Sequence, residues 1–166
     1  MTQTREAALF GLVCVVLFGL AWAVFSRLAS NGGPTIVQST GAITVAQANA
    51  QFPPGVPNSA KNIRYAAYNE WMAVLEVVRF EAPADDCIAH AERIIADFNA
   101  QNPDRTIPGL RPMNAVPEVD RSTPLSLDWF SPESIKHGLV GGESNSHTPV
   151  IWIDTDKGVF YYQYSD

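Results

Sequence analysis

Two aspartates near the end of the chain, Asp154 and Asp156, have the spacing that most resembles a metal-binding loop. A calcium loop of the EF-hand type needs oxygen ligands at alternate positions, a glycine at the sixth position and a glutamate at the twelfth. Counted from Asp154, these positions hold Val159 and Ser165, so both requirements fail. Apolar residues on either side and the glycine at 158 instead predict the turn of a β-hairpin.

The three histidines are the other candidates for a metal ligand or a general base. Asp86 lies four residues before His90, a spacing that places both side chains on one face of a helix. An ion pair or hydrogen bond is the simpler use of this pair, and a zinc ligand set is the alternative. His137 stands alone, and the serines before His147 lack the G-x-S-x-G pattern of a hydrolase, which predicts a surface loop there.

Cys87 and a group of aromatic residues complete the candidates. Cys87 falls among apolar residues at helical spacing, whereas a reactive thiol needs an accessible, electropositive setting. The last strand is rich in aromatic residues, which is typical of cross-strand pairs, although a ligand platform is the alternative; they are Phe160, Tyr161, Tyr162 and Tyr164, with Trp152 on the preceding strand. The sequence therefore assigns no catalytic, cofactor-binding or metal-binding residue and predicts a protein that is not an enzyme.

The elements that must position these residues are a helix and two hairpins. Apolar residues recur at spacings of three and four over 84–100, which predicts an amphipathic helix. Residues 62–69 alternate, with Arg64 on the face opposite Ile63, and residues 72–82 are rich in β-branched and aromatic side chains. These two runs predict one antiparallel hairpin, and the last 18 residues predict another. Residues 102–124 hold five prolines and no clear periodicity, which indicates a binding loop or, more simply, irregular packed chain.

The N-terminal part carries the clearest location signal. Residues 7–25 form an uncharged apolar run of 19 residues, long enough to cross the ~30 Å hydrocarbon core as a helix. A cleaved signal peptide, and hence a secreted protein, is the alternative, but the run is long for one and a poor cleavage site follows it. Two positive charges, Arg5 and the α-amine, precede the run, and Arg27 follows it. The charge bias that favours an extracytoplasmic domain therefore rests on one charge. Two pairs of small residues four apart, Ala7 with Gly11 and Gly19 with Ala23, would allow the helix to self-associate, although Val15 interrupts the repeat.

These observations predict a chain in four parts: a short tail (1–6), a transmembrane helix (7–25), a flexible tether (26–57) and a soluble domain (58–166). The expected domain is α+β, with an antiparallel sheet of about four strands and one amphipathic helix packed on a face. The net charge of −6 disfavours nucleic acid as a partner. With one cysteine outside the apolar run, the domain depends on a hydrophobic core, because no intrachain disulfide can form there.

Three stretches carry a resemblance to a group of proteins. They are "FPPGVPNSAKNIRY", "AVLEVVRFEAPADDCIAH" and the closing "YYQYSD". The P-x-S-A-x-N-I pattern and the strand that runs into P-x-D-D and a helix resemble small bacterial lipoproteins and membrane-anchored envelope proteins of unassigned function. The chain departs from the lipoprotein members because it lacks an acylated cysteine. The resemblance implies a bacterial envelope location and the architecture above, and it implies no activity.

The function expected from the sequence is a non-catalytic accessory or protein-interaction domain, anchored in the membrane through residues 7–25 and facing the envelope, where another envelope protein would be its partner. No cofactor is expected. A small-ligand-binding or sensing domain that uses residues 102–124 and exposed aromatic side chains is the second hypothesis, and a metal-dependent hydrolase is the third.

Overall fold

The computed structural model describes residues 34–71, 73–121, 125, 127–143 and 147–166. The chain divides into two units, Met1–Pro34 and Thr35–Asp166, and the second holds all the described helices and strands. The described elements, in chain order, are β1 (Thr35–Gln38), α2 (Val45–Gln51), β2 (Lys61–Glu70), β3 (Ala73–Glu81), α3 (Ala84–Gln101), β4 (Arg111–Pro112), the 3-10 helix η1 (Pro132–Ser134), β5 (Gly138–Gly142), β6 (Thr148–Asp154) and β7 (Val159–Ser165).

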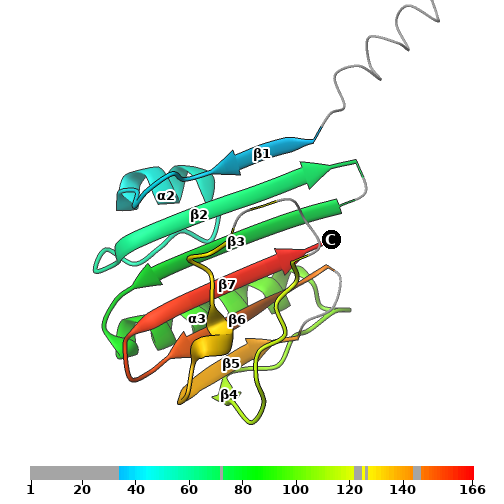
Figure 1. Cartoon of the computed structure of the whole chain (residues 1–166). Coiled ribbons are helices and arrows are strands. Elements are labelled where there is room, and N and C mark those ends of the chain that lie inside the picture. The colour runs from blue at the N-terminus through cyan, green and yellow to red at the C-terminus, as the bar shows by residue number, and fades with distance from the viewer. Residues whose placement is uncertain (1–33, 72, 122–124, 126, 144–146) are drawn as a thin grey trace, which may run out of the picture. The chain divides into compact units, whose positions relative to one another are not determined.

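The strands form one antiparallel sheet in the order β1-β2-β3-β7-β6-β5-β4 (Figure 1). The chain lays down β1, β2 and β3 side by side, then returns after α3 to complete the sheet with β4 to β7. The α+β class and the antiparallel sheet are therefore confirmed. The sheet has seven strands rather than the expected four, because β1, β4 and β5 are short or rich in glycine and lack the alternation that predicts a strand.

One face of the sheet, which we call the helix face, packs against α2 and α3. Cys87, Ala91, Ile94 and Ile95 of α3 meet buried residues of the sheet, and Phe52 at the end of α2 joins the same core. The sheet contributes Ile63, Tyr65, Val78, Phe80, Ile151, Ile153, Phe160 and Tyr162. Phe80 and Phe160 stack at 4.6 Å between ring centroids. The predicted helix and its apolar stripe are confirmed.

The other face of the sheet, which we call the loop face, packs against the irregular chain that leads from β4 to β5, in front of the sheet in Figure 1. Leu127, Phe130 and Ile135 supply its buried residues, and Met113, Val119 and Leu125 pack partly buried beside them. Phe130 contacts Tyr161 and Trp152 edge-on at 5.5 and 6.3 Å. In the described part of the proline-rich stretch, Ile107 is buried and Met113 and Val119 pack partly buried, whereas most of the other residues are exposed. A second covered face explains why β6 is buried along its whole length.

One sequence-based boundary needs correction. The predicted tether at 26–57 is too long, because the second unit begins at Thr35 and includes β1, α2 and the fully buried Phe52. Its Gly, Ser and Thr content suggested flexibility, but Thr44 caps α2 with a reciprocal capping box to Gln47. The predicted transmembrane helix at 7–25 lies outside the described residues. Neither described α-helix has both the length and the apolar run that a membrane crossing needs.

Gly158 fixes the turn of the final hairpin. Its φ is +64°, and a Cβ atom built there would lie 2.3 Å from the carbonyl oxygen of Ala82. Gly158→Ala should therefore lower the free energy of unfolding by about 1–3 kcal/mol, because left-handed geometry and a backbone clash act together. Urea denaturation of the purified protein measures this change. Gly41→Ala is the matched control, since a Cβ there meets no atom within 4 Å and should change stability little. Equal stability of the two variants would contradict this account of the turn.

Candidate binding site at the β1 edge

The two edges of the sheet differ in how well they are protected. The β4 edge is two residues long and ends in Pro112, a residue that cannot donate to a further strand. The β1 edge has neither proline nor lysine and exposes Ile36 and Val37, whose side chains are 51% and 42% accessible. Of the described strands, only β2 pairs with β1. An unprotected apolar edge strand is a template for binding another extended chain.

The hydrogen bonds of β1 show which backbone groups face outward. The Ser39 N–H donates to the Tyr65 carbonyl at 2.9 Å, so this pair is a hydrogen-bonded one. In an antiparallel ladder such pairs alternate with pairs that make no mutual backbone bonds. Val37, two residues before Ser39, therefore bonds to β2, whereas the backbone N–H and C=O of Ile36 point toward the outer side of β1.

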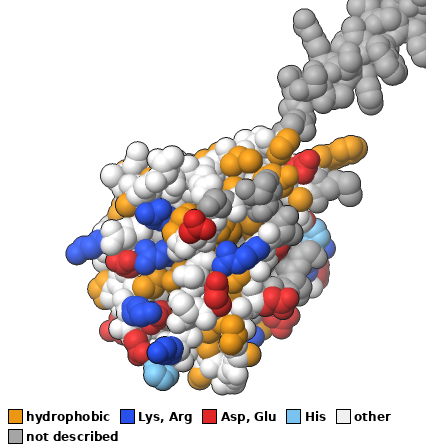
Figure 2. All heavy atoms as spheres, viewed as in Figure 1, with side chains coloured by type: hydrophobic (Ala, Val, Ile, Leu, Met, Phe, Trp, Pro, Cys, Tyr) orange, Lys and Arg blue, Asp and Glu red, His pale blue; other side chains and the backbone are white. Residues whose placement is uncertain are grey.

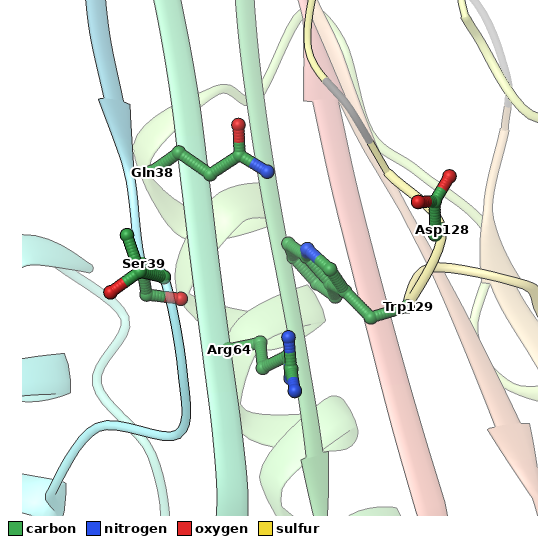
Figure 3. A pocket seen from close by; sticks show the side chains of 6 residues that line it. Gln38, Ser39, Arg64, Asp128 and Trp129 are labelled. Atoms are coloured by element: carbon green, nitrogen blue, oxygen red, sulfur yellow. The ribbon is translucent and has the colours of Figure 1, made fainter.

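A shelf opens on the loop face beside this edge, between β1 and the described turn that carries Trp129. The shelf has a volume of about 510 Å³ and is lined by Gln38, Ser39, Thr40, Arg64, Asp128 and Trp129. Figure 3 shows the Arg64 guanidinium and the Trp129 indole side by side over the sheet, with Gln38 across the opening. The shelf thus joins residues of β1, β2 and the irregular chain.

The turn that carries Trp129 is held in place by its neighbour. The N–H of Phe130 donates to the Leu127 carbonyl at 2.9 Å and closes a tight turn. Phe130 is fully buried, and its ring meets the Trp129 ring edge-on at 5.9 Å. Burial of the phenyl ring therefore directs the indole toward the shelf. The indole Nε1–H is buried and has no hydrogen-bond acceptor among the described residues.

The electrostatics of the shelf are set by two arginines on adjacent strands. Arg64 lies directly opposite Arg79 in the β2–β3 register, so the two cations share the loop face. The Glu81 carboxylate accepts from Arg79 at 2.6 Å and from Asn62 at 2.7 Å, and both bonds hold the pKa of Glu81 below its usual range. Arg64 makes no side-chain hydrogen bond or ion pair with any described residue. The Glu81 carboxylate therefore balances the charge of Arg79, and the Arg64 guanidinium is left open to a ligand.

Residues 154–158, which include Asp154 and Asp156, form the turn between β6 and β7, as the sequence predicts. The side chain of Asp154 is only 4% accessible, and its Oδ1 accepts from the backbone N–H groups of Asp156 and Lys157 at 3.1 and 3.0 Å. Its other oxygen lies 3.3 Å from the Lys157 ammonium. Asp156 points to His137 at 2.8 Å. The carboxylates are therefore used within the hairpin and its neighbour.

Asp86 and His90 do not pair in the way that their spacing suggested. Asp86 accepts a short hydrogen bond from Ser59 at 2.5 Å, and His90 Nδ1 lies 3.2 Å from Arg93 Nη2. The imidazole packs edge-on against Phe80 and Phe160. Burial, followed by the repulsion of Arg93, lowers the pKa of His90 to about 4. A neutral imidazole that accepts from Arg93 and packs against phenyl rings is a core residue.

The remaining candidates also fall in structural roles. Cys87 is fully buried, and burial raises the pKa of its thiol to about 11, so the prediction of a core cysteine is confirmed. His147 contacts the Asp166 carboxylate, where the chain ends beside β6. Trp152 lies opposite Tyr161 and contributes to the loop-face core, as expected of a cross-strand pair. Among the described residues, no group of three or more histidine, cysteine, aspartate or glutamate side chains is arranged to hold a metal ion.

The residues that form the shelf were not singled out by sequence reasoning. Alternation in β2 places Arg64 on the face of Ala66 and Tyr68, which the structure confirms, and an arginine on a half-apolar strand face was the available signal. Trp129 gave no such signal, because its position depends on a turn within irregular chain.

In the comparisons with known proteins, no family model, no curated protein and no solved structure matches this chain.

His90 predicts an acid-sensitive core. Its folded-state pKa lies below the ~6.5 of an unfolded histidine, so the unfolded chain binds the extra proton more readily. The neutral His90 imidazole therefore contributes its full share of stability above pH ~6.5, and this contribution is lost as the pH falls toward 4. The free energy of unfolding should decrease by about 3 kcal/mol across that window, as measured by urea denaturation at a series of pH values.

The control for this prediction is His90→Leu, which removes the titrating group and keeps an apolar side chain. Its stability curve should lack the histidine contribution between pH 6.5 and 4. Glu76 contributes with the opposite sign, because burial raises its pKa, so the comparison rests on the difference between the two proteins. Identical pH dependence in both would show that His90 is accessible to protons in the folded state.

Proposed function

We propose that this chain is a non-catalytic interaction domain that binds an extended segment of a partner protein by strand addition at β1. The observation that supports it is the outward-facing backbone of Ile36 on an edge strand that exposes Ile36 and Val37 and has no described strand beyond it. A short edge of this kind offers few backbone hydrogen bonds, so side-chain contacts must add affinity. The shelf lies on the side of β1 where alternate side chains of an added strand would project.

The proposal includes a membrane-anchored domain that faces the bacterial envelope. The apolar run at 7–25 supports the anchor, and residues 26–34, which separate it from β1, reach at most ~32 Å when extended. Trp71 supports the same reading from the domain itself. It is 93% accessible at the tip of the β2–β3 hairpin, where Asn69 pairs with Thr35 at the start of β1. Tryptophan side chains are favoured at the membrane–water boundary.

Hydrophobic side chains are visible at this end of the domain in Figure 2, over β1 and the β2–β3 tip. Lys and Arg side chains occupy other parts of the same view, interspersed with Asp and Glu. The Arg121–Glu133 ion pair is one such contact between opposite charges on the domain. A surface with mixed charge and a localised apolar edge suits a protein partner better than nucleic acid or an anionic membrane.

A small-ligand-binding or sensing domain is the second candidate function. The shelf favours it, because about 510 Å³ lies within the range of small-molecule sites and an arginine, a tryptophan and an amide converge there. The shelf is open to solvent rather than enclosed, so a ligand held there alone would keep much of its surface in water.

Ile36→Pro tests strand addition with little effect on the fold. Proline removes the N–H of residue 36, which points outward, and leaves the β1–β2 hydrogen bonds of Val37 intact. A photoreactive residue at Thr35 should crosslink a partner in native membranes, and Ile36→Pro should abolish most of that product.

Ile36→Thr is the matched control, because it keeps the backbone donor and the β-branched shape while reducing apolar area. It should retain the crosslink at reduced yield. If Ile36→Pro crosslinked as efficiently as the native chain, with an unchanged unfolding midpoint, strand addition at β1 would be excluded.

A further inference from the structure

We infer that the shelf between β1 and Trp129 is a carboxylate-binding site, in which Arg64 holds the carboxylate and the Trp129 indole contacts an apolar or planar group attached to it. The inference deepens the proposed function, because a partner strand docked on β1 would bring such a group to the shelf. It stands on the side chains of the shelf itself, so it can be tested apart from strand addition.

The first argument is charge. Arg64 and Arg79 face the same side of adjacent strands, and the Glu81 carboxylate bonds to Arg79 at 2.6 Å. Two guanidinium groups opposite each other repel, and a second carboxylate would relieve that repulsion. Arg64 presents a planar fork of donors that matches a carboxylate in a two-point contact. The charge of the site therefore favours binding of one anionic group.

The second argument is the balance of hydrogen-bond donors. The Trp129 Nε1–H is buried and lacks an acceptor among the described residues, a condition that costs about 1–3 kcal/mol. The Ser39 hydroxyl oxygen accepts from the Tyr65 N–H at 3.1 Å, so its own O–H remains available as a donor. The Arg64 guanidinium and the Ser39 hydroxyl thus supply donors around the opening, and the Trp129 ring lines it beside Arg64 (Figure 3). A ligand rich in acceptors satisfies these donors.

The third argument concerns the limits of the site. Asp128 also lines the shelf, and Figure 3 shows it beyond Trp129 from Gln38. Its carboxylate disfavours a second anionic group at that end. A monocarboxylate is therefore preferred over a polyanion such as a polyphosphate or a nucleic acid strand. The Trp129 ring supplies a flat apolar surface between the two ends, which suits a hydrophobic or planar group next to the carboxylate.

The strand geometry predicts how a peptide would present this group. Ile36 and Gln38 project to the loop face, as shown by their pairing with Tyr68 and Ala66, whose side chains lie in the loop-face core. Side chains of an added strand project to the same face at every second residue. An acidic residue near the Gln38 end, two positions from an apolar residue beside Ile36, would place its carboxylate over the shelf. A free organic acid could occupy the shelf without the strand.

The test uses the full-length protein in detergent micelles with ¹⁵N-labelled arginine and tryptophan side chains. Benzoate is the probe, and benzamide is its uncharged control with the same ring. Benzoate should shift the Arg64 Nε–H and Trp129 Nε1–H signals, with Trp129→Phe used to assign the indole. Benzamide should shift neither, and added salt should weaken benzoate binding.

Arg64→Gln should weaken benzoate binding about tenfold or more, as expected on loss of a charge-assisted hydrogen bond. Arg64→Lys, which keeps the charge but not the fork, should retain part of the affinity. Arg105→Gln is the matched control, with the same charge change in the turn after α3, and should bind as the native chain does. Equal shifts with benzamide, or benzoate affinity unaffected by Arg64→Gln in a folded variant, would overturn the inference.

A peptide arm separates the two sources of the carboxylate. A short β-forming peptide with a glutamate two positions from a valine should bind more tightly than its glutamine counterpart. Ile36→Pro should abolish peptide binding while benzoate binding persists. Loss of the peptide arm alone would therefore contradict strand addition and leave the carboxylate site standing, whereas loss of the benzoate arm would remove the site.

Discussion

Burial of the central sheet on both faces is the constraint on which the rest of this structure depends. The α3 helix covers one face through Cys87, Ala91 and Ile94, and irregular chain anchored by Phe130 covers the other. Because both faces are packed with side chains, the middle of the sheet offers no polar groups to a ligand. Among the described residues, the edge strand β1 and the shelf adjoin each other and do offer them.

The two faces also treat charge differently. On the helix face, burial raises the pKa of Glu76, which accepts from the Tyr65 hydroxyl at 3.1 Å, and burial lowers the pKa of His90. Both groups are thus driven toward their neutral forms, as a packed core requires. On the loop face near β1, by contrast, Arg64 remains charged and unpaired among the described residues, beside Arg79. The helix face holds the fold together, and the loop face at β1 keeps the charge that can recognise a ligand.

The sequence predicted the parts of this fold that have strong local patterns. The spacing of three and four in 84–100 identifies α3. The alternation around Ile63 identifies the first hairpin and the faces of β2, and the apolar residues on either side of the Gly158 turn identify the second hairpin. It could not predict β1, β4 or β5, because short or glycine-rich strands are specified by their neighbours. The tether was placed wrongly for the same reason: Phe52 is held by tertiary packing that composition does not reveal. Trp129 lies beside Arg64 because Phe130, its neighbour in the chain, packs against Trp152 and Tyr161. These packing partners are distant in the sequence, so local patterns do not reveal them.

Amide hydrogen exchange at Ile36 and Val37 tests the open β1 edge most directly, since the two N–H groups point in opposite directions from one strand. In the isolated protein, the Ile36 amide should exchange with solvent at nearly the rate of an unstructured peptide, while the Val37 amide is protected by its bond to β2. Binding of a partner segment should then protect Ile36. Strong protection of Ile36 in the isolated protein would show that the edge is already covered and would contradict an open site for strand addition.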